Sequence, residues 1–442
     1  MTHRLAAAVL ALLCSCSGLV TDPPGGGDGG GSAGGGSGGG GVASGGGGGA
    51  VGGGTGGGGT GGGGTGGGTG DTDAGAGGGG GAVDAGPDTV PIFLAIGHVA
   101  RTIVSCDDGL TWSGNRSDDD GVRCFAGTMV DGGSSDCDHK YGAGRGVAFT
   151  GSAFVANFGW GDPGTIRRSV DGVTWSTVDM GANFASMVLG EGGRLIAAAR
   201  SSKVSTDDGR TWTSAAVADL KDPGGATVWN VRRGGFGGAD GGVFVLVGDG
   251  PSVAVSADGA AWRFPSVLPT TCGQAMQWEG GVVGSARVLV MLGGDGVACR
   301  STDDGATWTE VATGAAEVSS RLLWTGTEFL AWGTGSGTAG GPRLFRSADG
   351  ASWTSTPTTV TRTDGAGRTT TSPGPTIGPV ARSPSGTFVA VRGGWNVWYE
   401  QQRFYRSTDG VSWTELPTTS FTGSHPLTHI VWGQAARSAV CP

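Results

Sequence analysis

The chain has 442 residues, of which 98 are Gly, and its formal net charge is −9. Charged residues make up only 15% of the sequence, and they form no tract or stripe of Lys and Arg. This composition argues against a nucleic acid as the partner. Gly is concentrated between residues 25 and 86, so the chain length does not convert directly into a number of folded domains.

The N-terminal stretch MTHRLAAAVLALLCSCSG contains one Arg, a short apolar run from Leu5 to Leu13, and then small residues. The run is too short to span a bilayer, so residues 1–15 are predicted to be an export signal. The ending LCSC resembles the bacterial lipoprotein box, which implies a lipid on Cys16 and membrane contact through that lipid alone. Because Ser17 replaces the family's retention Asp, the resemblance implies an outer-membrane lipoprotein, surface-exposed or periplasmic. An ordinary secretory signal is the alternative.

Residues 16–89 consist mainly of Gly, together with Thr, Ser, Ala and a few Asp. Such a segment has almost no apolar surface to bury, so nothing offsets the backbone entropy that ordering would cost. We predict that it is a disordered tether and that the folded domain covers residues 90–442.

One short phrase recurs seven times after the tether, and we call each copy the repeated turn. The copies are SCDDGLTW (105–112), SVDGVTW (169–175), STDDGRTW (205–212), SADGAAW (256–262), STDDGATW (301–308), SADGASW (347–353) and STDGVSW (407–413). Short apolar runs separated by Gly flank the copies, which indicates hairpins of antiparallel strands. A period of about 50 residues is typical of a β-propeller blade. We predict an all-β, seven-bladed propeller of four-stranded antiparallel blades.

The repeated turn resembles the Asp-box, or BNR repeat, of sialidase-type β-propellers, which is also found in sortilin-like receptors and photosystem assembly factors. Asp can accept hydrogen bonds from N–H groups two or three residues further on, and Gly supplies a positive φ. An active site repeated seven times would be unusual, whereas a turn that holds a hairpin must recur in every blade. The Asp residues of the seven turns are therefore predicted to be structural: Asp107, Asp171, Asp207, Asp258, Asp303, Asp349 and Asp409.

A propeller must join its first and last blades, or it leaves unpaired strand edges. The C-terminal run LTHIVWG matches the pattern of an inner strand, so we predict that it completes the blade begun by VPIFLAIG. Six cysteines follow the signal region, and they allow fifteen pairings. Their positions suggest Cys106–Cys441 across the closure, Cys124–Cys137 in an insert, and Cys272–Cys299 in one repeat. Without a C-x-x-C pair or spaced His, zinc is disfavoured.

The resemblance to sialidases implies demands that this sequence does not meet. That family uses an Arg-Ile-Pro motif near the first strand, and TVPIFLAIGHVART lacks it. The chain has only three tyrosines, and none can be matched to the family's Tyr nucleophile. A carboxylate pair for ordinary glycoside hydrolysis cannot be picked out from sequence alone. No catalytic residue is therefore predicted, and enzymatic activity stays an open alternative.

Ligand-binding residues are predicted on the inner strands, which line the central channel of a propeller. The candidates from different repeats are Arg145, Arg321, Arg382 and His429. A second set of arginines directly precedes the Ser of four turns, namely Arg168, Arg300, Arg346 and Arg406. A row of guanidinium groups could hold an acidic ligand, but its regular recurrence favours pairing with neighbouring carboxylates.

An acidic insert follows the first turn, with six Asp residues between Asp118 and Asp138. Oxygen-rich loops suit calcium, yet the spacing matches no defined calcium loop, so a solvated acidic loop is the favoured interpretation. We predict no metal or other cofactor.

These features together predict a monomeric, surface-tethered extracytoplasmic lipoprotein that binds a cell-envelope or matrix polysaccharide, or an envelope protein, without catalysis. The alternatives are a sialidase-like glycoside hydrolase or polysaccharide lyase, and an envelope assembly scaffold.

Overall fold

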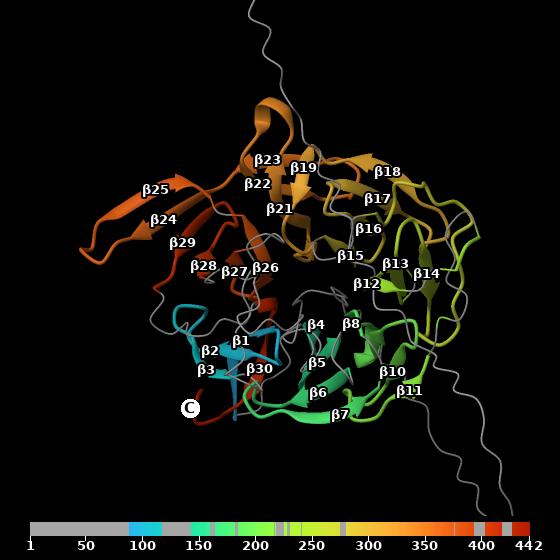
Figure 1. Ribbon diagram of the computed structural model, residues 1–442, viewed down its shortest axis with the longest axis horizontal. Coiled ribbons are helices and arrows are strands. Elements are labelled where there is room, and N and C mark those ends of the chain that lie inside the picture. The colour runs from blue at the N-terminus through green and yellow to red at the C-terminus, as the bar shows by residue number, and fades with distance from the viewer. Residues whose placement is uncertain are drawn as a thin grey trace, which may run out of the picture. The chain divides into compact units, whose positions relative to one another are not determined.

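A computed structural model shows an all-β fold (Figure 1). It describes residues 88–116, 143–159, 164–181, 184–215, 217, 225–227, 230–239, 241–274, 280–374, 376–392, 403–417 and 427–442. Within these ranges the only helices are two single 3₁₀ turns, Glu191–Gly193 and Gly337–Ala339. No helix in the described part of the chain is long and apolar enough to cross a membrane.

Seven antiparallel sheets, the blades, are arranged in a ring (Figure 1). The strands of each blade are given from the centre outwards. Blade 1 consists of Leu427–Ala436 (β30), Thr89–Gly97 (β1), Thr102–Ser105 (β2) and Ser113–Arg116 (β3), and blade 2 consists of Ala143–Phe149 (β4), Phe154–Gly159 (β5), Thr165–Ser169 (β6) and Ser176–Met180 (β7). Blade 3 consists of Ser186–Leu189 (β8), Leu195–Ala198 (β9), Lys203–Ser205 (β10) and Thr213–Ser214 (β11). The predicted seven-bladed propeller is confirmed.

Blades 4 to 7 continue around the ring in chain order. Blade 4 consists of Val231–Gly237 (β12), Val243–Gly248 (β13) and Val253–Ser256 (β14), and blade 5 consists of Gly281–Gly284 (β15), Leu289–Leu292 (β16), Val297–Ser301 (β17) and Thr309–Ala312 (β18). In blade 6, Ala315–Val318 (β19) and Leu323–Trp324 (β20) share the inner position, followed by Phe329–Gly335 (β21), Pro342–Ser347 (β22) and Thr354–Pro357 (β23). Blade 7 consists of Ile377–Arg382 (β26), Phe388–Arg392 (β27), Phe404–Ser407 (β28) and Ser412–Glu415 (β29).

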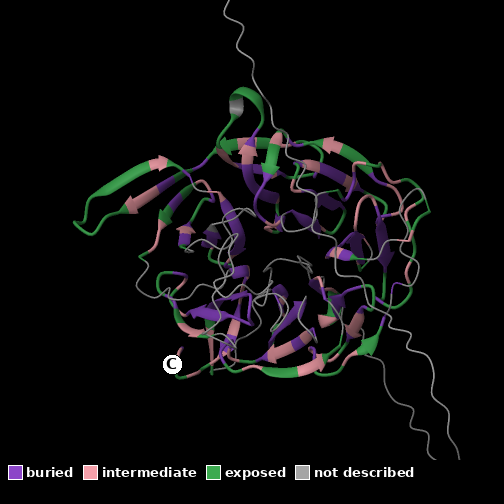
Figure 2. Ribbon diagram, viewed as in Figure 1, coloured by how far each residue is buried: buried purple, intermediate pink, exposed green. Residues whose placement is uncertain are grey.

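The middle strands of the blades are apolar throughout because neighbouring blades cover both of their faces. In β13 the sequence VFVLVG is buried at every position, whereas the outer strand β18, TEVA, is mostly exposed. Figure 2 shows this gradient from the buried inner strands to the exposed outer ones. The alternation expected for a half-exposed sheet is therefore absent from the strands that lie between blades.

Two blades depart from the four-stranded pattern. In blade 4 the fourth strand is reduced to one bridge, Val255 to Arg263, because the following segment crosses to blade 5, where Val267 pairs with Thr307. Blade 7 gains an extra hairpin, Thr359–Thr363 (β24) and Thr369–Pro373 (β25), and β24 pairs in parallel with β29.

The repeated turns follow the third strand of each blade and lead into the fourth. In the third turn, Asp207 Oδ1 accepts hydrogen bonds from Ser205 Oγ (2.8 Å) and from the N–H groups of Arg210 (3.1 Å) and Thr211 (2.9 Å). Its Oδ2 accepts from Thr211 Oγ1 at 2.7 Å. All seven Asp residues accept from the Ser hydroxyl two positions earlier and from at least one backbone N–H of their own turn. These contacts lock the hairpin locally.

The three turns with the longer phrase contain a second Asp in the left-handed region: Asp108 (φ 60°), Asp208 (φ 58°) and Asp304 (φ 54°). Asp tolerates this conformation better than most residues. Each of these carboxylates accepts from the preceding blade: Asp108 from Thr387 Oγ1 (2.6 Å), Asp208 from Ser152 Oγ (2.7 Å) and Asp304 from Ala239 N–H (2.8 Å). The extra residue therefore fastens adjacent blades together.

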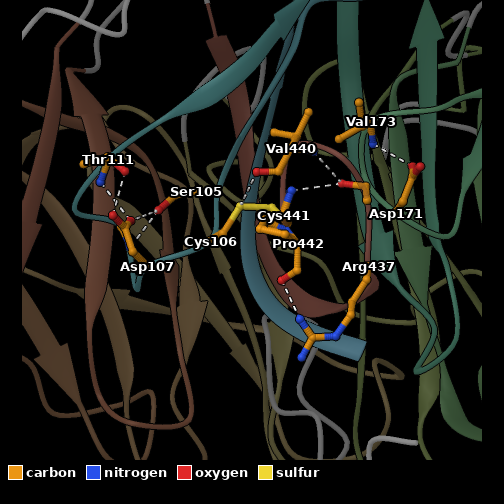
Figure 3. Close-up of a disulfide and its surroundings, with 12 residues drawn as sticks. Ser105, Cys106, Asp107, Thr111, Asp171, Val173, Arg437, Val440, Cys441 and Pro442 are labelled. Atoms are coloured by element: carbon orange, nitrogen blue, oxygen red, sulfur yellow. Dashed lines mark hydrogen bonds between the residues drawn. A yellow bond between two sulfur atoms is a disulfide. The ribbon is translucent and has the colours of Figure 1, made fainter. Parts of the chain in front are cut away.

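The ring closes in blade 1, where the last strand of the chain pairs with the first. β30 and β1 form an antiparallel ladder from Thr89 opposite Ala436 to Gly97 opposite Leu427. A disulfide between Cys106 and Cys441 joins the repeated turn of this blade to the C-terminus (Figure 3). The predicted closure is confirmed, and both chain ends of the propeller are held in one blade.

A second disulfide joins Cys272, in the segment that crosses from blade 4, to Cys299 on β17. The structure thus contains two of the three suggested pairings. Four other predictions concern residues outside the described ranges. They are the signal at 1–15, the lipid on Cys16, the pairing of Cys124 with Cys137, and the acidic insert from Asp118 to Asp138. The same is true of the tether at 16–89, apart from its last two residues, since β1 begins at Thr89.

Candidate functional site

The site lies in the channel at the centre of the ring, a cavity of about 400 Å³ to which the inner strand region of every blade contributes. Close packing of neighbouring inner strands depends on glycine. A Cβ on Gly235 of β12 would lie 2.1 Å from the carbonyl oxygen of Val282 on β15, and a Cβ on Gly146 of β4 would lie 2.2 Å from the Met187 nitrogen on β8. These contacts set the width of the channel.

Most of the channel wall is apolar. Side chains such as Val147, Met187, Val282, Leu323 and Ile430 line it. The hydroxyl groups on the described wall come from Thr150 and Ser186, and no described lining residue is Asp or Glu. No group of three or more His, Cys, Asp or Glu side chains that could hold a metal ion occurs among the described residues.

Basic residues gather at one end of this channel. Arg145, Arg233 and His429 are each the third residue of their inner strands, β4, β12 and β30, and Arg321 lies two residues before β20. The blades repeat one strand order, and each inner strand is antiparallel to the second strand of its blade, so the inner strands run in the same direction along the channel. The four basic side chains therefore lie near one end, although Arg145 is the extra residue of a β-bulge and is not in register with Arg233 and His429.

His429 connects Arg321 to Thr428. Its Nε2 lies 3.2 Å from Arg321 Nη2, and its Nδ1 lies 3.0 Å from Thr428 Oγ1. Because a guanidinium can only donate, Nε2 must accept, so the ring proton is on Nδ1 and is donated to Thr428. The Thr428 hydroxyl in turn donates to the Gly144 carbonyl at 2.7 Å. The chain of bonds fixes a neutral imidazole and orients the Arg321 head group.

The electrostatics of the cluster agree with a neutral His429. Burial is the main cause that lowers the pKa of His429 well below its usual range, and four nearby basic groups add to it. These groups are Arg321, Arg233, Arg145 and His98. The nearby basic groups therefore favour the uncharged form of His429.

His98 belongs to a turn that places further basic groups in the interior. The β1–β2 connection bonds Arg101 N–H to the His98 carbonyl at 3.0 Å, and its two central residues, Val99 (φ 55°) and Ala100 (φ 51°), are left-handed. A β-branched residue in this region is strained. His98 and Arg101 are nevertheless fully buried, and Arg101 Nε donates to Asn115 Oδ1 at 2.9 Å. Strain of this kind is typical of functional regions.

Of the four predicted ligand residues, the structure brings three together and separates one. Arg145, Arg321 and His429 share the basic end, although Arg145 is buried behind the wall instead of lining it. Arg382 lines the channel but is the last residue of β26, so it lies at the opposite end. Its guanidinium lies over the Phe388 ring, 5.5 Å from the centroid.

Arg233 and His98 were not among the residues predicted from the sequence. VRR at the start of β12 resembles AGR at the start of β4, but Arg232 and Arg145 are each the extra residue of a β-bulge, so Arg145 corresponds in register to Arg232 and not to Arg233. Arg232 does not line the channel and pairs with Asp249. No equivalent sequence signal marked His98, which depends on the unusual turn.

Three of the four arginines that precede repeated turns connect blades, whereas Arg346 approaches Glu328 of its own blade. Arg168 Nε donates to the Asp208 carbonyl (3.0 Å), Arg300 Nε to the Asp349 carbonyl (2.7 Å) and Arg406 Nε to the Asp108 carbonyl (2.9 Å), in each case in the turn of the next blade. Arg406 also pairs with the Asp108 carboxylate at 2.7 Å, and Arg346 lies 3.9 Å from Glu328. Pairing was expected, but the shared acceptor is a backbone carbonyl in place of a carboxylate.

Comparisons with known proteins find similarity in fold alone. No protein-family model and no curated protein sequence matches the chain. Among solved structures, YCF48 bound to D1 peptide is 16% identical, with a TM-score of 0.39, and the match covers 80% of this chain and 95% of that one. YCF48 from Cyanidioschyzon merolae is 14% identical, with a TM-score of 0.39, covering 66% and 95%. A putative 6-phosphogluconolactonase from Bacteroides uniformis is 9% identical, with a TM-score of 0.47, covering 78% and 99%.

Proposed function

We propose that the protein is a non-catalytic binding protein of the cell envelope, whose channel receives the anionic group of an acidic envelope polysaccharide or protein. The observation that carries this proposal is the set of basic groups at one end of the channel, Arg233, Arg321 and His429 on its wall with Arg145 behind it. Positive charges concentrated in a cavity with low-dielectric walls attract anions and exclude cations.

The chemistry of the wall supports binding over catalysis. Glycoside hydrolysis of the ordinary kind requires two carboxyl groups on either side of the scissile bond, and none of the described residues on the channel wall is an acid. Tyr405, which lies on β28 in the last repeat, is buried within blade 7. The alternative of a sialidase-like hydrolase or a lyase therefore has no described residues in the channel to support it.

The N-terminal sequence supplies the location in this proposal. Residues 1–15 would direct export, lipidated Cys16 would anchor the protein in the outer membrane, and the Gly-rich tether would hold the propeller away from the surface. A Cys16→Ala variant is expected to move the protein from the membrane fraction to the soluble fraction. Retention of this variant in the membrane fraction would contradict the anchor.

The binding proposal is tested by comparing Arg233→Ala with Arg232→Ala. Both variants remove one Arg from the same strand, but only Arg233 faces the channel, while Arg232 pairs with Asp249. Retention of an acidic oligosaccharide and of an acidic peptide is measured beside their esterified, uncharged forms. We expect Arg233→Ala to lose binding ten-fold or more and Arg232→Ala to keep it. Equal binding of charged and uncharged forms would refute the proposal, and product release would show an enzyme.

A further inference from the structure

We propose that the outer edge of the extra hairpin in blade 7 pairs with the same edge of a second copy of this chain, so that two propellers share one continuous sheet. This inference concerns assembly and does not depend on the ligand of the channel. It replaces the monomer expected from the sequence. Three features of the hairpin lead to it: how the hairpin projects, which backbone groups it leaves open, and which side chains would meet.

The hairpin of β24 and β25 is anchored at its base and exposed beyond it. β24 pairs in parallel with β29, and Val360 is buried in the core of blade 7. Further along β24, Arg362 pairs with Glu415 at 2.8 Å. β25 is exposed at four of its five positions, and the hairpin projects beyond the ring (Figures 1 and 2). Because a hairpin of two strands is marginally stable by itself, a third strand would stabilise it.

The hydrogen bonds of the hairpin determine which backbone groups face outward. Asp364 N–H donates to the Arg368 carbonyl at 2.9 Å beside the turn. Bonded and non-bonded pairs alternate along an antiparallel ladder. The backbone of Thr370 therefore bonds to β24, whereas the N–H and C=O groups of Thr369 and Thr371 face away from it. β25 is the last strand of its sheet within the described ranges, so these groups are open to a further strand.

A second copy of β25 matches this edge about a twofold axis at Thr370. In that register Thr369 of one copy lies opposite Thr371 of the other, and each such pair can exchange both of its hydrogen bonds. A register centred on Thr371 would instead place the ring of Pro373, which has no N–H, against a Thr369 carbonyl. The axis at Thr370 is therefore favoured, and the interface uses the same surface of both copies.

The side chains that would meet are neutral and compatible. β25, with the sequence TTTSP, carries no charge, whereas edges that avoid pairing commonly carry Lys or another charged residue. The adjacent Arg368 already pairs with Asp364 at 2.8 Å. Across the hairpin, Thr361 Oγ1 and Thr371 Oγ1 lie 3.0 Å apart. Cross-strand Thr pairs stabilise a sheet, and this row of threonines would continue into the second copy.

The test is sedimentation of the full chain over a range of concentrations. Because the shared edge is short, we expect a weak dimer with a Kd of about 0.1–1 mM. Thr371→Pro removes an outward N–H and leaves the hydrogen bonds within the hairpin in place, so it should weaken the dimer at least ten-fold. The matched control is Thr371→Val, which changes the same side chain but keeps the N–H, and it should dimerise as the unchanged protein does.

A second pair of variants tests the register. Thr370 of one copy lies directly opposite Thr370 of the other, so Thr370→Lys and Thr370→Glu each bring like charges together. Each variant alone should weaken the dimer at least ten-fold, and an equimolar mixture of the two should dimerise again. Thermal melting of each variant shows that it is folded before sedimentation is interpreted.

Four outcomes would overturn the inference. The first is a chain that stays monomeric up to about 1 mM. The second is a dimer that Thr371→Pro leaves unchanged, which would place the interface elsewhere. The third is a mixture of the Lys and Glu variants that stays monomeric, which would refute the twofold register. The fourth is a monomer whose Thr369 and Thr371 N–H groups become protected from hydrogen exchange when an unrelated extended peptide is added, which would assign the edge to a strand of another protein.

Discussion

Replacing Asp207 by Ala tests whether the repeated turns hold the propeller together. The change removes four hydrogen bonds, from Ser205 Oγ, Arg210 N–H, Thr211 N–H and Thr211 Oγ1. Hydrogen bonds to a charged group contribute about 1.5–3 kcal/mol each when shielded, but the turn is half exposed and water replaces part of them. We expect a loss of about 2 kcal/mol. With an unfolding entropy of about 0.7 kcal/mol/K for a unit of this size, Tm falls by about 3 °C.

The pH dependence of the same residue provides a second measurement. The N–H and then the hydroxyl of Thr211 are the main causes that lower the pKa of Asp207 from 3.8 to about 2. Because the folded state prefers the ionised form, this stabilisation is complete above about pH 4 and is lost as the pH falls towards 2. The difference in unfolding free energy between the unchanged protein and Asp207→Asn should therefore shrink by about half between pH 7 and pH 3.

Urea denaturation at both pH values measures this difference, and Glu191→Ala, which removes an exposed carboxylate outside the turns, is the control. The structural assignment of the seven Asp residues would be wrong if Asp207→Ala melted at the same temperature as the control. It would also be wrong if the variant bound no ligand while its stability was unchanged.

Three further changes test how the blades are joined. Arg406→Ala removes the contacts with the Asp108 carbonyl and carboxylate, and a loss of about 1–2 kcal/mol in urea is expected; no loss would mean that this inter-blade contact is not stabilising. Cys106→Ser opens a covalent loop with a sequence separation of 335 residues and should lower the free energy of unfolding by about 3–5 kcal/mol through loop entropy. Cys272→Ser, with a separation of 27, should lower it less, and a larger loss for Cys272→Ser in calorimetry would contradict the role of Cys106–Cys441 in ring closure. Gly235→Ala places a Cβ 2.1 Å from the Val282 carbonyl and should lower stability by at least about 1–3 kcal/mol, whereas Gly365→Ala, which meets nothing within 4 Å, should be nearly neutral.

Local sequence is enough to specify the turns and the number of blades. Ser205, Asp207, Gly209 and Thr211 lie within seven positions, so their hydrogen bonds form within one hairpin and need no distant partner. Seven copies of this local unit, each preceded by apolar runs, determine the number of blades. The closing strand was also predictable, because its apolar pattern matches an inner strand that blade 1 would otherwise lack.

The composition of the site depends on how the blades come together. Arg145, Arg233 and His429 are far apart in sequence and meet because the ring brings the beginnings of their inner strands to the same end of the channel. Arg382 was predicted with them, but the register of β26 puts it at the other end. Arg232 is the extra residue of a β-bulge and Arg233 is the next paired residue, so the two differ in role although they are neighbours. Pairing between the strands of each blade sets this register, and the closed ring then brings residues of different blades together.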